Sequence, residues 1–431
     1  MTAPEHHAGW GQGPCVVVDP YSSGALFAEA LARHGIPAVA VLTGPRPPEA
    51  YASSFRPQDF PDTVVYEGDL DGVVRQLAGR APRAVVAGCE SGVELAERLA
   101  PLLVPGRCNV PQLAEARRDK SRMAEAVAAA GLPVIPQICT ANADEVQEWL
   151  EKERLQGADL VLKPPKSAST DGVIKLPGGA DWRAVFERQL GRVNQFGEVD
   201  DRLIVQKFVT GTEYVVDTFS HDGRHSLVDV CAYRKVDNGP HMAVYDTMRW
   251  LPPDDAAVAG LTEYVFGVLD AVGMRVGAAH VEVMGTAEGP VLIELGARPH
   301  GGGQPRFNRN ATGDSQIDRT VRWLAGDEPP RGYALRAHQM CVFHMARRAG
   351  TVRSTAPLEA IRTLPSHHFS VLNLSHGDRV SLTKDLVDSL NFGFVILSHR
   401  EEEQLLEDYA TVRALEERLV VEEEPSTRSP S

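Results

Sequence analysis

The chain has 431 residues, with 44 basic and 58 acidic side chains and a formal net charge of −14. This length is sufficient for two to four domains with a substantial core. The acidic balance argues against a general binder of the nucleic-acid phosphate backbone. Because no apolar run reaches the ~20 residues of a membrane-spanning helix and the first residues lack the regions of a signal peptide, we expect a soluble, cytoplasmic protein that does not contact membranes.

Cysteine spacing and the composition of the two tails exclude some further classes. The six cysteines are scattered without a C-x-x-C pair, which argues against a structural zinc site and a disulfide framework. Residues 1–13 and 422–431 are polar and punctuated by Gly, Pro and Ser. We expect both tails to be disordered.

Strands alternate with helices in the first part of the chain. Strands are predicted at residues 15–19, 39–42 and 84–87, and helices at 25–34 and 93–103. This alternation predicts a parallel, Rossmann-like sheet over residues 14–112, and the missing G-x-G-x-x-G argues against dinucleotide binding. Glu90 and Ser91 follow a predicted strand, so they are candidates for a ligand site, with a structural loop as the alternative.

A helix is predicted in the segment RRDKSRMAEAVAAAGLPVIP, which begins at Arg117. Asp119 or Ser121 would cap this helix, and Gly131 would end it. Lys120 then lies at the helix start, where a positive charge is unfavourable unless an anion is also there. An ordinary surface lysine is the alternative.

The segment ADLVLKPPKSASTDGVIKLPGG contains two short predicted strands joined by a loop of small residues. The strand 160–163 ends at Lys163, and the strand 173–176 returns. The loop from Ser167 to Gly172 can bring backbone N–H groups and hydroxyls close to phosphates, while the lysine supplies positive charge. It is not a Walker A sequence, and a plain hairpin turn is the alternative.

Two more strands, 203–208 and 213–219, are predicted in RLIVQKFVTGTEYVVDTF. With a nucleotide across this edge, the backbone near 207–209 would contact adenine and Glu213 would accept the ribose hydroxyls. An ordinary sheet edge is the alternative. Residues 232–250 mix basic and aromatic side chains, which fits either a flexible cover over a reaction site or an exposed hairpin.

A hairpin is predicted in GAAHVEVMGTAEGPVLIELGARPHGG, residues 277–302, after a helix at 252–272. Alternation assigns one face to apolar side chains, namely Ala279, Val281, Val283, Val291, Ile293 and Leu295. The other face carries His280, Glu282 and Glu294. A register symmetric about a turn at 285–289 brings the two glutamates directly or diagonally across from each other, and such a repelling pair of oxygen ligands suits magnesium. The alternative is two solvated surface glutamates.

Arg298 follows Glu294 by four residues. A guanidinium beside a dicarboxylate magnesium site is suited to phosphate oxygens, because its planar fork binds them with two hydrogen bonds. The final part of the chain, 329–420, is predicted to form strands and a helix rich in Glu, Leu and Arg. It would complete the same core or form a dimer contact.

In their order along the chain, these segments resemble the ATP-grasp superfamily over roughly residues 110–327. The matching elements are RRDKSRMAEAVAAAGLPVIP, VLKPPKSASTDGV, IVQKFVTGTEYVVD and HVEV…LIELGARPHGG. The resemblance implies an α/β and α+β fold, in which a Rossmann-like domain (14–112) precedes an ATP-grasp fold of two α+β subdomains (113–205 and 206–330). A C-terminal α+β extension (331–421) would follow.

The resemblance also implies roles for individual residues. Lys120 and Lys163 would bind the ATP phosphates under a mobile loop that includes Ser167, Ser169, Thr170 and Gly172. The adenine hinge would comprise Gln206, Lys207, Phe208 and Val209, with Glu213 on the ribose. Glu282 and Glu294 would bind Mg²⁺, and Arg298 would hold the reacting phosphoryl group. Two residues depart from the usual pattern: Gly296 replaces an asparagine, and Ser169 replaces a glycine.

Within the superfamily, H-x-E followed by E-x-G-A-R-P is most similar to the L-amino-acid ligases, which form dipeptides and release ADP. The stretches AGCESGVELAERLA and NFGFVILSHREEE are similar to that group as well. The resemblance implies a ligase that joins amino acids and possesses a catalytic Arg298, with His280 as a catalytic or orienting group. The alternatives are a carboxylase or purine-pathway enzyme of the same fold and a non-catalytic nucleotide-binding subunit. The protein is compatible with a homodimer.

Overall fold

The structure is a computed structural model that describes residues 12–167, 171–194, 197–238 and 241–422. The chain forms two compact units. The first comprises residues 1–230, 253–309 and 314–333, and the second comprises residues 231–252, 310–313 and 334–431. The terminal segments 1–11 and 423–431, predicted to be disordered, lie outside the described residues. Glu422, which we expected in the disordered tail, instead pairs with Thr351 in a strand.

The first unit begins with the predicted parallel sheet. Its strands are β1 (Cys15–Val18), β2 (Ala38–Leu42), β3 (Thr63–Val65) and β4 (Ala84–Ala87), in the order β3-β2-β1-β4. The helices are α1 (Leu26–Arg33), α2 (Leu70–Ala78) and α3 (Val93–Leu103). Strand β1 ends one residue earlier than predicted, because Asp19 adopts a left-handed conformation with φ 49°.

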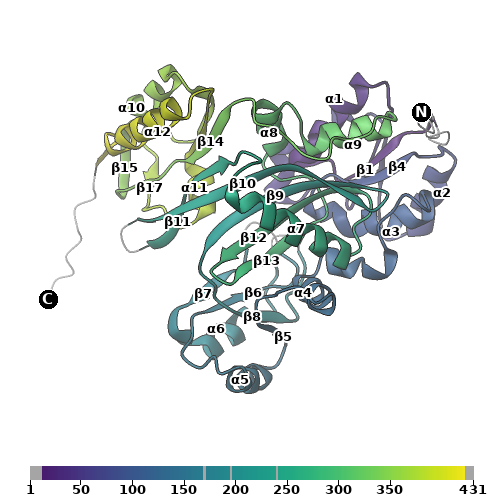
Figure 1. Ribbon diagram of the computed structural model, residues 1–431, viewed down its shortest axis with the longest axis horizontal. Helices are drawn as coiled ribbons and strands as arrows, with labels where there is room; N and C mark the ends of the chain where they lie inside the picture. The colour runs from purple at the N-terminus through teal and green to yellow at the C-terminus, as the bar shows by residue number, and fades with distance from the viewer. Residues whose placement is uncertain (1–11, 168–170, 195–196, 239–240, 423–431) are drawn as a thin grey trace. The chain divides into compact units, whose positions relative to one another are not determined.

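Helices cover both faces of this sheet (Figure 1). Val16 and Val18 pack with α2 and α3 on one face. Val17 packs on the other face with α1 and with α9 (Gln316–Leu324), whose Ile317 joins the same core. Because both faces are covered, the strands contain continuous apolar runs.

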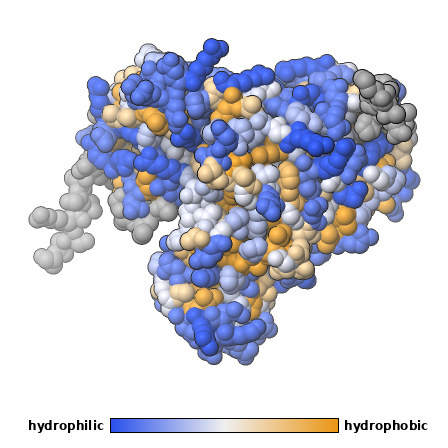
Figure 2. Space-filling view, viewed as in Figure 1, coloured by the Kyte–Doolittle hydropathy of each residue, from blue (hydrophilic) through white to orange (hydrophobic). Residues whose placement is uncertain are grey.

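The second sheet of the first unit has the order β5-β8-β6-β7 and is antiparallel. Its elements are α4 (Lys120–Ala129), β5 (Gln137–Thr140), α5 (Ala143–Lys152), β6 (Leu160–Lys163), β7 (Ile174–Leu176), α6 (Trp182–Gln189) and β8 (Leu203–Lys207). Apolar side chains of α5 and α6 cover one face. Figure 2 shows mostly hydrophilic side chains on the outer surface of this lobe. Helix α4 contacts the hairpin strand β13 and thereby connects the lobe to the rest of the unit.

The third part of the first unit contains the predicted hairpin. Its elements are β9 (Thr212–His221), the first part of β10 (Arg224–Asn238), α7 (Ala256–Ala271), β12 (Gly277–Thr286), β13 (Gly289–Gly296), α8 (Gln304–Thr312) as far as Arg309, and α9. The strand order is β13-β12-β9-β10. Helix α7 begins four residues later than predicted, because the side chain of Asp255 accepts a hydrogen bond from the N–H of Ala257 and caps it.

The second unit holds the C-terminal part of the chain. Its elements are the remainder of β10, β11 (His241–Trp250), β14 (His338–Phe343), β15 (Gly350–Ser354), α10 (Ala356–Glu359), β16 (His367–Leu372), β17 (Arg379–Val380), α11 (Leu386–Phe392), β18 (Gly393–His399), α12 (Glu402–Glu417) and β19 (Val420–Glu422). Arg413 on α12 forms an ion pair of 2.7 Å with the buried Asp246 on β11. Residues 232–238 and 241–250 pair as β10 and β11, so this segment contains a hairpin. It is not the exposed hairpin that we expected, because Asp246, Met248 and Trp250 are buried.

In the described ranges, the six cysteines form no disulfide, and four of them are buried. None of the helices in the described ranges combines the length and apolarity that crossing a membrane requires.

Candidate ATP and magnesium site

Two glutamates face each other on the hairpin of the first unit. Glu282 on β12 is the direct antiparallel partner of Glu294 on β13. Their side chains are about one quarter exposed, at 25% and 24%. Like charges directly opposite each other destabilise a hairpin, so the pair needs positive charge nearby. The predicted apposition is confirmed, and the two carboxylates would offer oxygen ligands of the kind that a hard cation prefers.

The apolar face of the hairpin differs from the prediction. A β-bulge lies between the pairs Glu282–Glu294 and Val283–Leu292, so Ile293 is an extra residue on β13. Leu292 is therefore buried at 7% exposure, whereas Val291 and Ile293 are only partly buried. Strict alternation from the strand end failed here because a bulge shifts the side chains that follow it to the opposite face.

Lys120 lies beside Glu294 at the start of α4. Asp119 caps this helix by accepting hydrogen bonds from the backbone N–H groups of Ser121 and Arg122. The Lys120 Nζ lies 3.1 Å from Glu294 Oε2 and donates a 2.7 Å hydrogen bond to the carbonyl of Ser167. A positive charge at a helix start is unfavourable unless an anion is nearby, and for Lys120 this anion is the Glu294 carboxylate.

Lys163 ends β6 and is buried at 5% exposure near the same carboxylates. Burial lowers the pKa of Lys163 to about 8. The positive charge of Lys120 also lowers this pKa, whereas the negative charges of Glu294 and Glu282 raise it and offset only part of the effect. Burial alone would raise the pKa of Glu294, but Lys120 and Lys163 outweigh it and lower that pKa to about 2. Two lysines and two carboxylates therefore share one poorly hydrated region, where phosphates and a divalent cation would balance their charges.

Arg298 pairs with Glu90 of the N-terminal sheet. Its Nε donates a 2.9 Å hydrogen bond to Glu90 Oε2, and Arg118 Nη1 lies 3.7 Å from Glu90 Oε1. Burial opposes the charge of Arg298, but Glu90 raises its pKa above the ordinary value. A Cβ on Gly296 would lie only 3.0 Å from Glu90 Oε2 and 3.1 Å from the Arg298 guanidinium. The glycine that replaces the usual asparagine therefore leaves room for this pair.

His280 contacts the metal-ligand candidate Glu282, with Nε2 3.3 Å from Oε1. Its other ring nitrogen faces the buried Asp217, which also contacts His300. Sequence reasoning did not single out Asp217, His300 or Arg118, and it treated Glu90 only as a candidate. The histidine directly after A-R-P was the one available signal for His300.

The predicted adenine hinge follows β8. The Gln206 side chain donates a 2.8 Å hydrogen bond to Gln137. The backbone N–H groups of Lys207 and Phe208 donate to the carbonyls of Pro136 and Asp159, so the fold itself uses both donors. Val209 lies in the loop after them, and Glu213 is buried on β9. The adenine and ribose roles of these residues stay predictions.

The predicted phosphate loop is described only at its two ends. Ser167 is buried and its carbonyl contacts Lys120, whereas Ser169 and Thr170 lie outside the described residues. Gly172 has a φ of 73°, and a Cβ there would lie 2.7 Å from Pro164. A glycine is therefore required where the loop turns back toward β7.

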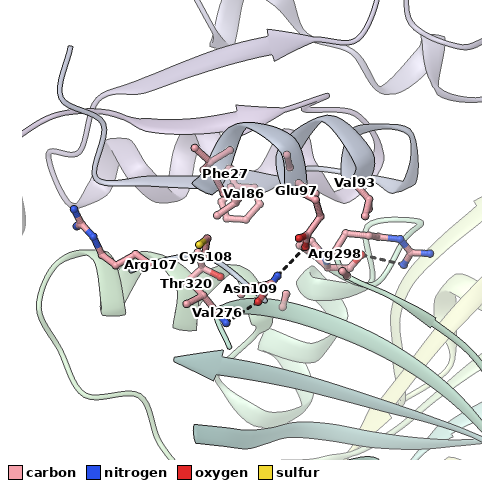
Figure 3. Close-up of a pocket in the computed structure, with 18 residues that line it drawn as sticks. Phe27, Val86, Val93, Glu97, Arg107, Cys108, Asn109, Val276, Arg298 and Thr320 are labelled. Carbon is pink, nitrogen blue, oxygen red and sulfur yellow. Dashed lines mark hydrogen bonds between the residues drawn. The ribbon is translucent and has the colours of Figure 1, made fainter. Parts of the chain in front are cut away.

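A small cavity of about 40 Å³ lies in the first unit between α3 and β12 (Figure 3). Its wall includes Glu97, which accepts a 2.8 Å hydrogen bond from Asn109. This space holds about one water molecule. It is too small for a nucleotide, and the candidate ATP site is therefore the group of carboxylates and lysines described above.

Comparisons with known proteins agree with this geometry. Residues 156–304 match the family described as the ATP-grasp domain. Dapdiamide A synthase from Enterobacter agglomerans is 31% identical over 364 residues, which cover 82% of this chain and 84% of that protein.

Two solved structures share the fold at low sequence identity. The L-amino acid ligase from Bacillus licheniformis has a TM-score of 0.71 and 18% identity, covering 96% of this chain and 100% of that chain. Carboxyaminoimidazole ribonucleotide synthase from Aspergillus clavatus has a TM-score of 0.66 and 15% identity, covering 96% and 100%. The chain belongs to the ATP-grasp superfamily, among its ATP-using amide ligases.

Proposed function

We propose that this ligase uses ATP to convert the carboxylate of an amino acid, or of a related small acid, into an acylphosphate and then joins it to an amine. The observation that supports this most strongly is the direct pairing of Glu282 with Glu294 beside Lys120. Carboxylates flanked by lysines match the charges of a magnesium–triphosphate complex. The name of dapdiamide A synthase points to amide-bond formation as well.

In the proposed mechanism, Lys120 and Lys163 bind the phosphates of ATP, and Glu282 and Glu294 bind Mg²⁺. Bound magnesium would supply Lewis-acid stabilisation of charge on the transferred phosphoryl group. An oxygen of the substrate carboxylate attacks the γ-phosphorus, and the bond to the β-γ bridging oxygen breaks to release ADP. Arg298 then stabilises the negative charge on the acylphosphate.

The second step forms the amide. The amine nitrogen attacks the carbonyl carbon of the acylphosphate, the carbon–oxygen bond to phosphate breaks, and the nitrogen loses a proton. Arg298 would stabilise the oxyanion of the tetrahedral intermediate. The N–H of Gly302 is not available for this role, because it donates a 3.0 Å hydrogen bond to Ser22 Oγ. His280 would orient Glu282, which it contacts at 3.3 Å. The products are an amide or dipeptide, ADP and phosphate.

The test is phosphate release with ATP and magnesium over a pairwise panel of amino acids, with mass spectrometry of the products. A substrate labelled with ¹⁸O in its carboxylate should transfer one ¹⁸O atom to the released phosphate, because the carboxylate oxygen stays on phosphorus. Glu294→Gln should reduce turnover by roughly 10³-fold or more while circular dichroism remains unchanged. Near-normal turnover in this variant would remove the proposed metal role.

Two rival functions give different outcomes in the same assay. Phosphate release that depends on bicarbonate instead of an amino acid would indicate a carboxylase of the same fold. Binding of ATP without ADP release under any substrate pair would indicate a non-catalytic nucleotide-binding subunit. ATP hydrolysis that ignores the second amino acid would contradict the ligase mechanism.

A further inference from the structure

A buried aspartate in the first unit lies between two imidazole rings. Asp217 on β9 has no exposed surface. Its Oδ1 lies 2.8 Å from Nδ1 of His280, and its Oδ2 lies 2.9 Å from Nδ1 of His300. The two ring centroids are 4.0 Å apart. An ionised carboxylate only accepts hydrogen bonds, so both rings carry a proton on Nδ1, and one aspartate determines the orientation of both.

The first of these rings continues to the proposed metal ligand. His280 Nε2 lies 3.3 Å from Glu282 Oε1, on the side of the ring opposite to Asp217. Because each ring nitrogen faces a carboxylate, the contacts are satisfied when both nitrogens carry protons. Asp217, His280 and Glu282 thus form a chain of charge-assisted hydrogen bonds.

The second ring belongs to the segment that follows the catalytic candidate Arg298. The backbone N–H of His300 donates a 2.8 Å hydrogen bond to Gln316 Oε1. The side-chain amide of Gln316 in turn donates to the carbonyls of Ala279 and Thr218, at 2.8 and 3.2 Å. These two residues adjoin His280 and Asp217 in the chain. His300 is therefore held at its ring and at its backbone, two residues after Arg298.

Two histidines and an aspartate are also a common ligand set for transition metals. The possible ligand atoms of these three residues lie within 4.8 Å of one another. However, each oxygen of Asp217 lies at hydrogen-bond distance from a different ring nitrogen, and the remaining nitrogen of His280 faces Glu282. Hydrogen bonds account for these contacts without an ion, so the geometry favours a positioning role.

We propose that Asp217 is a positioning residue, which aligns Glu282 for Mg²⁺ through His280 and places the loop after Arg298 through His300. This inference rests on the proposed role of Glu282 as a magnesium ligand. Groups that hold a metal-ligating side chain from behind commonly change metal affinity by about 10- to 100-fold when they are replaced.

The test is Asp217→Asn, in which an amide NH₂ replaces one of the two accepting oxygens and cannot accept a ring N–H. Mn²⁺ serves as the probe, and electron paramagnetic resonance measures its binding to the full chain saturated with non-hydrolysable adenylyl imidodiphosphate. We expect the affinity for Mn²⁺ to fall about 10- to 100-fold. Asp229→Asn is the matched control, because Asp229 is equally buried and bonds to Asn308 instead of a histidine; its affinity should stay within about threefold of wild type.

Glu282→Gln separates failure of the inference from failure of the proposed function. If Glu282→Gln weakens Mn²⁺ binding but Asp217→Asn leaves it unchanged, the positioning role is wrong and the metal site stands. If Glu282→Gln binds Mn²⁺ normally, the metal assignment itself is wrong and the inference falls with it.

A measurement on the wild-type protein covers the case in which Asp217→Asn does not fold. Proton NMR with ¹⁵N-labelled histidine should show hydrogen-bonded Nδ1–H signals for two buried rings, assigned by their loss in His280→Gln and His300→Gln. Rings that carry a proton only on Nε2 would overturn the proposal. A stoichiometric transition metal in the purified protein would overturn it as well.

Discussion

The lowered pKa of Lys163 makes ATP binding depend on pH in a defined direction. With a pKa of about 8, this lysine is largely charged at pH 7 and largely neutral at pH 9 in the nucleotide-free protein. Triphosphate near its Nζ favours the charged form and raises the pKa. Nucleotide binding should therefore be accompanied by proton uptake at Lys163. The number of protons taken up equals the fraction of Lys163 that is neutral before binding, which is about 0.1 at pH 7, 0.5 at pH 8 and 0.9 at pH 9. Affinity should weaken roughly fivefold from pH 8 to pH 9.

Isothermal titration calorimetry with adenylyl imidodiphosphate measures this proton uptake. The apparent binding enthalpy is determined in buffers of different ionisation enthalpy, and its slope gives the number of protons taken up. Lys163→Arg is the control, because a guanidinium stays charged throughout this pH range. Subtracting the proton uptake of this variant from that of the wild type removes the contributions of the nucleotide and of other residues. Equal slopes in both proteins, or uptake that does not increase from pH 7 to pH 9, would refute the reasoning.

Two further variants test packing and the arginine of the site. Arg117→Leu removes a fully buried guanidinium that pairs with Glu97 and should lower the free energy of unfolding by about 3–5 kcal/mol in urea titrations, whereas a loss below about 1 kcal/mol would contradict the buried pair. Gly296→Ala places a Cβ 3.1 Å from Arg298 and should reduce kcat/KM about tenfold. Gly260→Ala, where the Cβ meets nothing within 4 Å, is its control and should leave the rate unchanged.

The hairpin was predictable from the chain alone, whereas the direct pairing of its carboxylates also required a β-bulge that the sequence did not indicate. Alternating side chains on both sides of a turn placed Glu282 and Glu294 on one face, and the structure pairs them directly. Lys120 and Lys163 were not predictable in this way, because each is an ordinary lysine in its local segment. Only the order of several weak motifs assigned them to phosphates, and the structure places Lys120 3.1 Å from Glu294.

The supporting groups escaped prediction because their partners are distant in the chain. Glu90 and Arg298 are separated by 208 positions, and Asp217 and His300 by 83. A buried aspartate inside a strand has no local signature that distinguishes a structural hydrogen bond from a role beside an active site. Such groups become interpretable only when the tertiary contacts are known.

The β-bulge in the hairpin explains both why the prediction of its apolar face was wrong and why its two carboxylates nevertheless lie opposite each other. The strands meet at a two-residue turn, where Thr286 pairs with Gly289, and the pairing continues regularly to Val283 and Leu292. Without this bulge, Ile293 would pair with Glu282, and the same register would place Glu294 opposite Val281, a fully buried position. One inserted residue shifts the rest of β13 by one position and brings Glu294 opposite Glu282 instead. The proposed magnesium site therefore depends on an irregularity of the strand as much as on the glutamates themselves.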